Sequence, residues 1–290
     1  MVIDVHALNF LKYAKKIKAF GDTITIGRQG IYVTESAIKK IIEAKADYKN
    51  KEYCEELLIE YFGAKKVESI DNSMYEKATY THNMNEPTPQ NLTGKFDTVF
   101  DGGCLEHIFN APQALKNCSL FCKKNAQIIH VLPTNNFCGH GFWQFSPELF
   151  FSLYSKENGY ADTEVFVADL SETKKWYQVK HLGKGQRAEI MSSNSLYILV
   201  RTVLIGNEFR HSNVQQSDYI YAWNNENDKN NNEEKLTFNK TCIKKIIKKN
   251  SFFYDVLYPI YNLYRNLKKN NKLNKKNPAL SVLQLKNFID

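Results

Sequence analysis

Apolar runs alternate with amphipathic stretches through the first 154 of the chain's 290 residues. The amphipathic stretches carry apolar residues at helical spacing and the short runs are rich in β-branched residues, so the pattern predicts helices and strands in turn. Such alternation is typical of a mainly parallel, doubly wound α/β sheet. The predicted strands are 22–26, 66–70, 78–82, 96–100 and 127–132, and the predicted helices are 1–20, 37–62 with a break near 47–50, 114–121 and 146–154.

The pattern changes after residue 154. Residues 163–168 and 195–204 are alternating apolar runs, which predict an antiparallel pair of strands separated by a long excursion rich in Gly and Lys, 174–186. Residues 225–234 are almost entirely polar, as in a flexible linker. Beyond them apolar residues recur at helical spacing. The sequence therefore predicts one domain over 1–224, a linker over 225–234, and a basic amphipathic helical tail over 235–290.

The stretch 96–151 reads as strand, polar turn, helix, strand and polar loop. Two parallel strands connected in this way place their carboxyl ends at one edge of the sheet, where open α/β sheets bind ligands. The two loops are too polar to serve only as connections, so we expect an active site there. Their polar residues are Asp101, Glu106, His107, Asn135, Asn136, His140 and Gln144.

The net charge of +8 is unevenly distributed along the chain. Residues 235–290 contain 13 Lys and Arg against two Asp, so they carry +11 and the remainder carries −3. A mildly acidic body argues against a catalytic face that follows a phosphate backbone, and modification of nucleic acid is the weakest of the functions considered.

The six cysteines form no CxxC pair and no recognised zinc spacing. The first 20 residues contain no signal-like apolar segment, and no stretch approaches the roughly 20 apolar residues that cross a bilayer. We therefore expect reduced thiols in a cytoplasmic protein that is soluble or peripheral at the inner face of the membrane.

Two segments, FDTVFDGGCLEHIFN (96–110) and LPTNNFCGHGFWQFSPELFF (132–151), resemble the class I methyltransferases that depend on S-adenosylmethionine (SAM). The second is similar to a bacterial subgroup associated with surface-glycan biosynthesis. The resemblance covers about 20–205 and is weakest in the first half. It implies a seven-stranded Rossmann-like sheet whose last two strands form a hairpin-like pair. It also implies an enzyme that methylates oxygen or nitrogen of a small polar or glycan acceptor, in polysaccharide or capsule biosynthesis.

The resemblance assigns cofactor-binding positions to the loops after four strands. The first loop departs from the family's GxGxG turn, because only Gly27 and Gly30 are glycines; Arg28 would pair with the methionine carboxylate, and an ordinary tight turn is the alternative. Asp71 would accept the ribose hydroxyls, which suits an acceptor-only carboxylate, or would instead cap a local turn. The full set is Gly27, Arg28, Gln29, Asp71, Asn72, Asn83, Asp101 and Gly102, with Asn85 also near the expected adenine.

Methyl transfer is an in-line displacement that requires an aligned acceptor and a group that takes its proton. His140, His107 and Glu106, in that order, are the expected bases, although His107 could equally be a capping or core residue. Related methyltransferases with a Glu-x-x-Glu-His arrangement bind a divalent metal, but Gly103 stands where the first Glu would be. Glu106, His107 and His140 would form a sparse ligand set, so a divalent metal is an alternative that we do not favour. The loop with His140, Trp143 and Gln144 is either an acceptor-pocket wall or a structural cover.

The tail carries lysines beside an aromatic stripe, so it either lies on an anionic membrane or packs on the body. The altered first loop also favours a second class of function, a catalytically inactive relative that serves as a scaffold for membrane or partner proteins.

Overall fold

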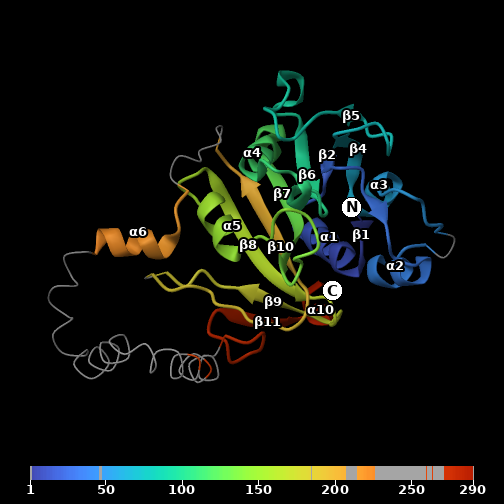
Figure 1. The fold of residues 1–290 in the computed structure, drawn as a ribbon. Helices are drawn as coiled ribbons and strands as arrows, with labels where there is room; N and C mark the ends of the chain where they lie inside the picture. Colours follow the sequence, from blue (N-terminus) through green and yellow to red (C-terminus); the bar gives the residue numbers. More distant parts are fainter. Residues whose placement is uncertain are drawn as a thin grey trace, which may run out of the picture.

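The computed structural model describes residues 2–45, 48–183, 185–206, 214–225, 259, 263 and 271–289. A nine-stranded sheet runs through the molecule, with helices on both of its faces (Figure 1). Its strand order is β11-β9-β8-β10-β7-β6-β2-β4-β5, and a separate parallel pair joins β1 to β3. The strands are β1 (Val2–Ile3), β2 (Gly21–Ile26), β3 (Gly30–Ile31), β4 (Ala64–Asp71), β5 (Tyr80–Thr81), β6 (Phe96–Asp101), β7 (Cys122–Asn135), β8 (Tyr160–Asp169), β9 (Lys175–Val179), β10 (Leu196–Leu204) and β11 (Leu280–Gln284).

The five strands from β5 to β7 are mutually parallel, and β10 runs antiparallel to both of its neighbours, β7 and β8. These seven strands confirm the predicted Rossmann-like core with a hairpin-like last pair. The prediction of only seven strands is wrong, because β9 and β11 extend the sheet beyond β8 in antiparallel fashion. The sheet is therefore mixed rather than mainly parallel at this edge.

The helices begin at the capping signals that the sequence supplies. Asp4, Thr34, Asn110 and Ser146 each accept a hydrogen bond from a backbone N–H in the first turn, which satisfies a donor that the helix leaves free. The helices are α1 (Val5–Ile17), α2 (Glu35–Ile42), α3 (Glu55–Phe62), α4 (Ala111–Phe121), α5 (Pro147–Leu153), α6 (Ser217–Asn224) and α10 (Leu285–Ile289), with 3-10 turns η1 (Gln90–Leu92) and η2 (Leu105–His107).

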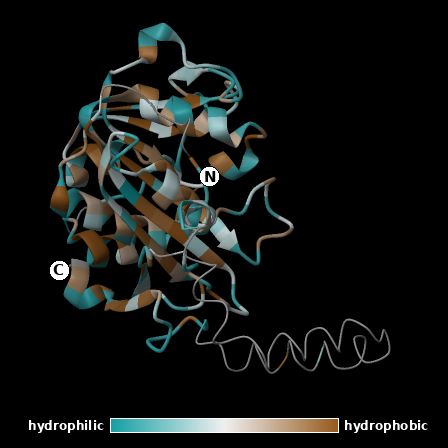
Figure 2. Ribbon diagram, turned by 90° about the vertical axis from the view of Figure 1, so that its left-hand side faces the viewer, coloured by the Kyte–Doolittle hydropathy of each residue, from teal (hydrophilic) through white to brown (hydrophobic). Residues whose placement is uncertain are grey.

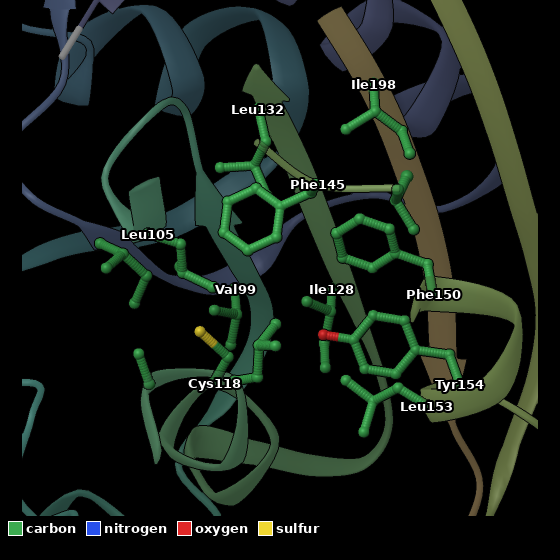
Figure 3. Packing of buried hydrophobic residues seen from close by; sticks show 14 of the residues in the cluster. Val99, Leu105, Cys118, Ile128, Leu132, Phe145, Phe150, Leu153, Tyr154 and Ile198 are labelled. Atoms are coloured by element: carbon green, nitrogen blue, oxygen red, sulfur yellow. The ribbon is translucent and has the colours of Figure 1, made fainter. Parts of the chain in front are cut away.

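Two hydrophobic clusters cover the two faces of the sheet. Successive strand residues point to opposite faces, so Val99 belongs to one cluster and Phe100 to the other. The first cluster contains Phe150 and Tyr154 from the α5 region, which pack over Ile128 on β7 (Figure 3). The second lies under α1, α3 and α10. Figure 2 shows the apolar residues concentrated on the strands between these layers.

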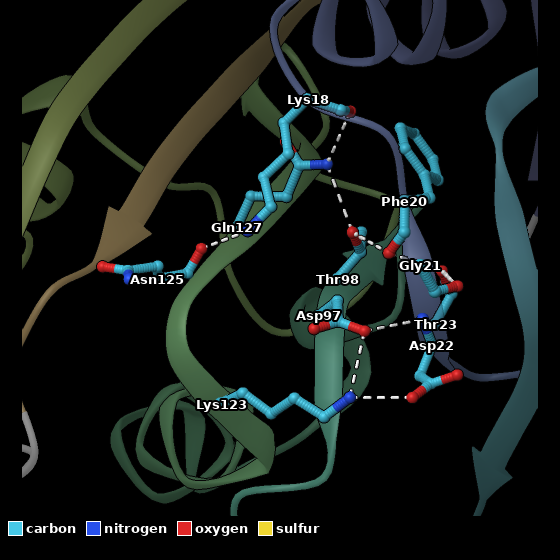
Figure 4. A network of polar contacts seen from close by, with 10 residues as sticks. All are labelled: Lys18, Phe20, Gly21, Asp22, Thr23, Asp97, Thr98, Lys123, Asn125 and Gln127. Atoms are coloured by element: carbon cyan, nitrogen blue, oxygen red, sulfur yellow. Dashed lines mark hydrogen bonds and ion pairs between the residues drawn. The ribbon is translucent and has the colours of Figure 1, made fainter.

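An ion-paired network holds the amino ends of the central strands (Figure 4). The Lys123 ammonium lies 2.7 Å from a carboxylate oxygen of Asp22 and 3.0 Å from one of Asp97, and the backbone N–H of Asp22 donates to Asp97. Thr98 donates to the carbonyl of Phe20 and accepts from Gln127. The network fixes β2, β6 and β7 relative to one another at the edge opposite the predicted site.

The end of the chain returns to the body. β11 pairs antiparallel with β9, and Phe288 of α10 stacks on Tyr13 of α1 with ring centroids 4.7 Å apart. The predicted helical tail is therefore wrong for 271–289, because pairing and aromatic packing stabilise a strand and a short helix there. Most of the predicted tail, and the linker after Asn225, lie outside the described residues. In the parts of the chain that are described, no helix is long and apolar enough to cross a membrane.

Candidate functional site

A cavity of about 330 Å³ opens at the carboxyl edge of the sheet, beyond β4 and β5. The chain runs outward from β2 to β4 and β5, then returns to the other side of β2 with β6, so the strand order reverses between β2 and β6. Ligands of open α/β sheets bind at such a reversal. The cavity lies beside it and is lined by Ile70, Asp71, Asn72, His82, Asn83, Met84, Asn85, Cys104, His107 and Ile108.

The structure thus brings together the predicted residues Asp71, Asn72, Asn83 and His107. One carboxylate oxygen of Asp71 accepts the backbone N–H of Ser73 at 3.1 Å, as the turn-capping alternative requires. Among the described residues, its second oxygen has no hydrogen-bond donor, so the same side chain can cap the turn and still face the cavity. The Asn83 side chain accepts from Asn85, which shapes the opposite wall.

The first loop makes internal contacts instead of leaving its groups free. Arg28 lies over the ring of Tyr53, donates to Glu55 at 2.6 Å and donates to the carbonyl of Glu76 at 2.9 Å. The expected pairing of Arg28 with a ligand carboxylate is therefore not present here, because Glu55 already supplies the opposite charge. The backbone N–H of Gly27 likewise donates to Ile70.

Gln29 fills the space between the first and fourth loops. Its fully buried amide donates to the carbonyl of Ile26 at 2.7 Å, and its oxygen has no partner. A Cβ added to Gly102 would lie 2.6 Å from that oxygen, so glycine is needed at this approach. Gly27, Arg28, Gln29 and Gly102 are therefore packed at the sheet edge, and none of these four lines the cavity.

Asp101 is fully buried and both of its carboxylate oxygens are engaged. One accepts the backbone N–H of Cys104 at 2.9 Å and the other lies 3.0 Å from Nδ1 of His130. Nε2 of His130 in turn lies 2.7 Å from the hydroxyl of Tyr154. We expected Asp101 to face the cofactor, but this carboxylate is directed into the core and holds the loop that precedes Glu106.

The three predicted bases converge on one point. Oε1 of Glu106 lies 3.4 Å from Nε2 of His140 and 3.8 Å from Nε2 of His107, and the two rings are 4.8 Å apart. Glu106 is almost completely buried, whereas both histidines are about half exposed. Burial, followed by the nearby charge of Asp101, raises the pKa of Glu106 to about 8. Burial and the neighbouring His140 lower the pKa of His107.

One nitrogen or oxygen from each of these three side chains lies within 4.8 Å of the others, which is a spacing that a metal ion tolerates. The second oxygen of Glu106 is buried without a partner. The donor set therefore fits a cation with imidazole and carboxylate ligands, although we did not expect a metal here.

Backbone contacts fix the loop that carries His140. The N–H groups of Phe142 and Trp143 both donate to the carbonyl of Glu106, at 2.6 and 3.3 Å, and the Trp143 indole donates to the carbonyl of Ile108. Gly141 has a φ of +69°, and a Cβ there would lie 2.7 Å from that same carbonyl. The loop is thus packed directly on η2, which explains how His140 reaches Glu106 across 34 positions of sequence.

Two further cavities continue from this loop along α5. The first, about 250 Å³, is lined by residues that include Asn135, Gln144 and Leu196, and the second, about 430 Å³, lies farther out. Both are lined by Ser146, Pro147 and Ala188, so they adjoin along α5, and we call the two together the groove. The outer part carries charged side chains of both signs and a Phe–His pair: Glu148, Lys180, Arg187, Glu189, Phe151 and His181.

His130, Tyr154 and the groove were not predicted from the sequence. His130 stands inside the apolar run 127–132, and a polar residue in a buried strand was a usable signal. No pattern within a single segment of the sequence indicated the outer part of the groove. Its walls come from three separate segments, which are α5, the excursion after β9 and residues 214–216.

No known protein family and no curated protein matches the sequence. Solved structures with a similar arrangement include a SAM-dependent methyltransferase of Thermotoga maritima, at 14% identity over 69% of this chain and 91% of that one, with a TM-score of 0.39. The N-methyltransferase NodS of Bradyrhizobium japonicum has 10% identity over 68% and 93%, with a TM-score of 0.38. The 1,6-didemethyltoxoflavin-N1-methyltransferase of Burkholderia thailandensis, with bound 1,6-didemethyltoxoflavin and S-adenosylhomocysteine, has 10% identity over 70% of this chain and 78% of that one, with a TM-score of 0.37. Similarities this distant do not by themselves assign an activity.

Proposed function

We propose that the protein is a SAM-dependent methyltransferase. The observation that supports this most strongly is the cavity beside the strand-order reversal. Asp71, Asn83 and His107 line it, and His107 also belongs to the cluster with Glu106 and His140. In this proposal the free oxygen of Asp71 accepts the ribose hydroxyls, and the loop of Asn83 contacts adenine. Bound SAM would supply the electrophilic methyl group.

The chain's own part in the reaction is to orient the acceptor and to take its proton. His140 and His107 are exposed enough to reach an acceptor, and Glu106 lies within 4 Å of both. A proton removed by either imidazole can pass to Glu106, because burial raises the affinity of that carboxylate for a proton.

Replacing Asp71 by alanine should weaken binding of S-adenosylhomocysteine by about 10- to 100-fold, the effect of losing a hydrogen bond to a charged group. Isothermal titration calorimetry measures this affinity directly. Glu60→Ala, which removes an equal charge from the exposed surface of α3, is the matched control and should leave the affinity unchanged. Equal affinities for the Asp71 variant and the wild type would contradict the ribose assignment.

The scaffold alternative is favoured by one observation, the closed first loop with Gln29 and Arg28 held internally. The same titration separates the two functions. Micromolar binding of S-adenosylhomocysteine by the wild type supports the enzyme, whereas no heat and no thermal shift support the inactive relative.

For the acceptor we propose a neutral polar molecule of the glycan class, bound in the groove along α5, in polysaccharide assembly. Mixed charges, amide groups and an aromatic pair suit hydroxyl groups and a sugar ring better than they suit an anion. A panel of neutral mono- and oligosaccharides, with nucleotide sugars and small amines as the charged comparison, identifies the acceptor when it is incubated with SAM carrying a labelled methyl group.

Ala188→Trp should then raise the KM for that acceptor by about tenfold or more, because the indole would fill the connection between the two cavities. Binding of S-adenosylhomocysteine should not change. An unaltered KM would remove the groove from the acceptor site.

Repeating the panel after dialysis against EDTA tests whether the cluster of Glu106, His107 and His140 requires a metal. We expect the activity to persist.

A further inference from the structure

Helix α6 carries its aromatic residues on the outside of the molecule. None of its residues is buried, and the exposed fractions of Tyr219, Ile220 and Trp223 are 50%, 37% and 58%. Figure 1 shows the helix standing apart from the layers that cover the sheet. Large apolar side chains gathered on one short exposed element normally mark a binding surface.

The opposite side of α6 is attached to the body. Asp218 accepts from Arg187 at 2.6 Å, and the backbone N–H of Ser217 donates to Glu148 of α5 at 2.7 Å. Tyr221 lies against Gly185, where an added Cβ would approach the ring to 2.8 Å. These contacts orient the helix, so its free side is set by the fold.

Helical geometry defines that free side. At 100° per residue, Tyr219, Ile220 and Trp223 lie within about 100° of one another, while Asp218 and Tyr221 lie on the side that meets the body. The rings of Tyr219 and Trp223 are stacked with centroids 6.0 Å apart. The Tyr219 ring also lies 5.9 Å from the Arg187 guanidinium, and half of this side chain remains exposed. We call Tyr219, Ile220 and Trp223 the aromatic face.

We propose that the aromatic face docks on an anionic membrane surface. Trp and Tyr combine an apolar ring with a polar atom, and both are enriched at the boundary between lipid and water. The sequence that follows supplies the matching charge: residues 235–270 contain nine Lys and Arg against one Asp. Residues 226–234 carry four acidic residues and one Lys, so 226–270 still carries a net +5.

The two contributions are complementary in physical terms. Lysines near an anionic surface are attracted to it, but this attraction falls off within a Debye length and disappears in high salt. Partial burial of two aromatic rings in the interface is short in range and insensitive to salt. A protein that uses both binds anionic vesicles more tightly than neutral ones and retains part of that binding in salt.

The test is flotation of the full chain with vesicles of phosphatidylcholine and phosphatidylglycerol, and with vesicles of phosphatidylcholine alone. We expect the wild type to float with the anionic vesicles. The double variant Tyr219→Ser, Trp223→Ser should lower the partition coefficient about tenfold or more. The matched control is Tyr32→Ser, Tyr75→Ser, which removes two aromatic rings that are 80% and 90% exposed elsewhere and should change binding less than twofold.

Three results would overturn the proposal. The first is a wild type that does not bind anionic vesicles. The second is equal binding by the wild type and both double variants, which would leave the membrane contact to the lysines alone. A third is self-association in analytical ultracentrifugation that the α6 variant abolishes, since the aromatic face would then be covered by a second copy. Thermal unfolding of each variant verifies that these exposed substitutions leave the fold intact.

Discussion

Glu106→Gln is expected to lower the rate of methyl transfer by about 10²- to 10⁴-fold, the usual contribution of a positioned proton acceptor. Glutamine has nearly the same shape, so the contacts of the Glu106 backbone with the loop of His140 should persist. The substitution removes the carboxylate that lies within 4 Å of both histidines. The measurement is kcat with the acceptor identified by the panel, together with the affinity for S-adenosylhomocysteine, which should be nearly unchanged.

His82→Asn is the control for Glu106→Gln, because His82 lines the cavity together with His107 but lies outside the cluster of Glu106, His107 and His140. Its effect on kcat should be small. Equal losses in the two variants, or a loss of cofactor affinity that matches the loss of rate, would mean that Glu106 shapes the cavity and does not act in proton transfer.

The pH dependence of the same reaction follows from the burial of Glu106. A raised pKa of about 8 means that the carboxyl is largely protonated at pH 7 and can accept a proton only as the pH rises through that value. The rate should therefore increase with pH through about 8, where half of the carboxyls are ionised, and level off about one pH unit above it. Glu106→Gln should lack this limb. Folding raises this carboxyl pKa, so the contribution of the bound proton to stability is fully present below the ordinary pKa of 4.5, is lost as the pH rises from there to about 8, and changes no further above 8.

Asp101→Ala is expected to lower the free energy of unfolding by about 3–5 kcal/mol, because it leaves the N–H of Cys104 and Nδ1 of His130 buried without their partner. Asp101→Asn is the matched variant, since its amide can still accept from Cys104 and approach His130, and it should cost much less. Urea unfolding of both variants measures the difference.

The two roles considered for Asp101 give different results in that experiment. A residue that only contacts the cofactor would weaken binding of S-adenosylhomocysteine and leave the urea midpoint unchanged. A residue that holds the loop lowers the midpoint first, and binding decreases as a consequence. Equal stability of the alanine variant and the wild type would contradict the network described here.

The parallel half of the sheet was predictable because each of its elements carries its own signal. The run 96–100 is apolar, and Asn110 and Ser146 are N-caps before amphipathic stretches, so local chemistry and tertiary structure agree. β9 and β11 were not predictable in the same way. They are five residues each, they pair with one another across about 100 positions of sequence, and no local pattern encodes that partner.

The same distinction, between local signals and partners that are distant in sequence, applies to the residues of the candidate site. Asp71, Asn83 and His107 were predicted because each follows a strand, and parallel strands bring their carboxyl ends together. Arg28 was assigned to a ligand because the resemblance places it in the first loop, beside the expected methionine carboxylate. In the fold its partner is Glu55, 27 positions away. Side chains whose partners come from distant elements are the ones that sequence patterns assign least well.

The pairing of β11 with β9 determines how the protein behaves after a protease cleaves the chain between α6 and β11. Residues 226–270 are joined at one end to α6 and at the other to a strand that is hydrogen-bonded into the sheet. A protease that cleaves within them produces two polypeptides, and the smaller one keeps its five-residue pairing with β9 and the stacking of Phe288 on Tyr13. The nicked molecule should therefore migrate as one species under native conditions and separate only when denatured.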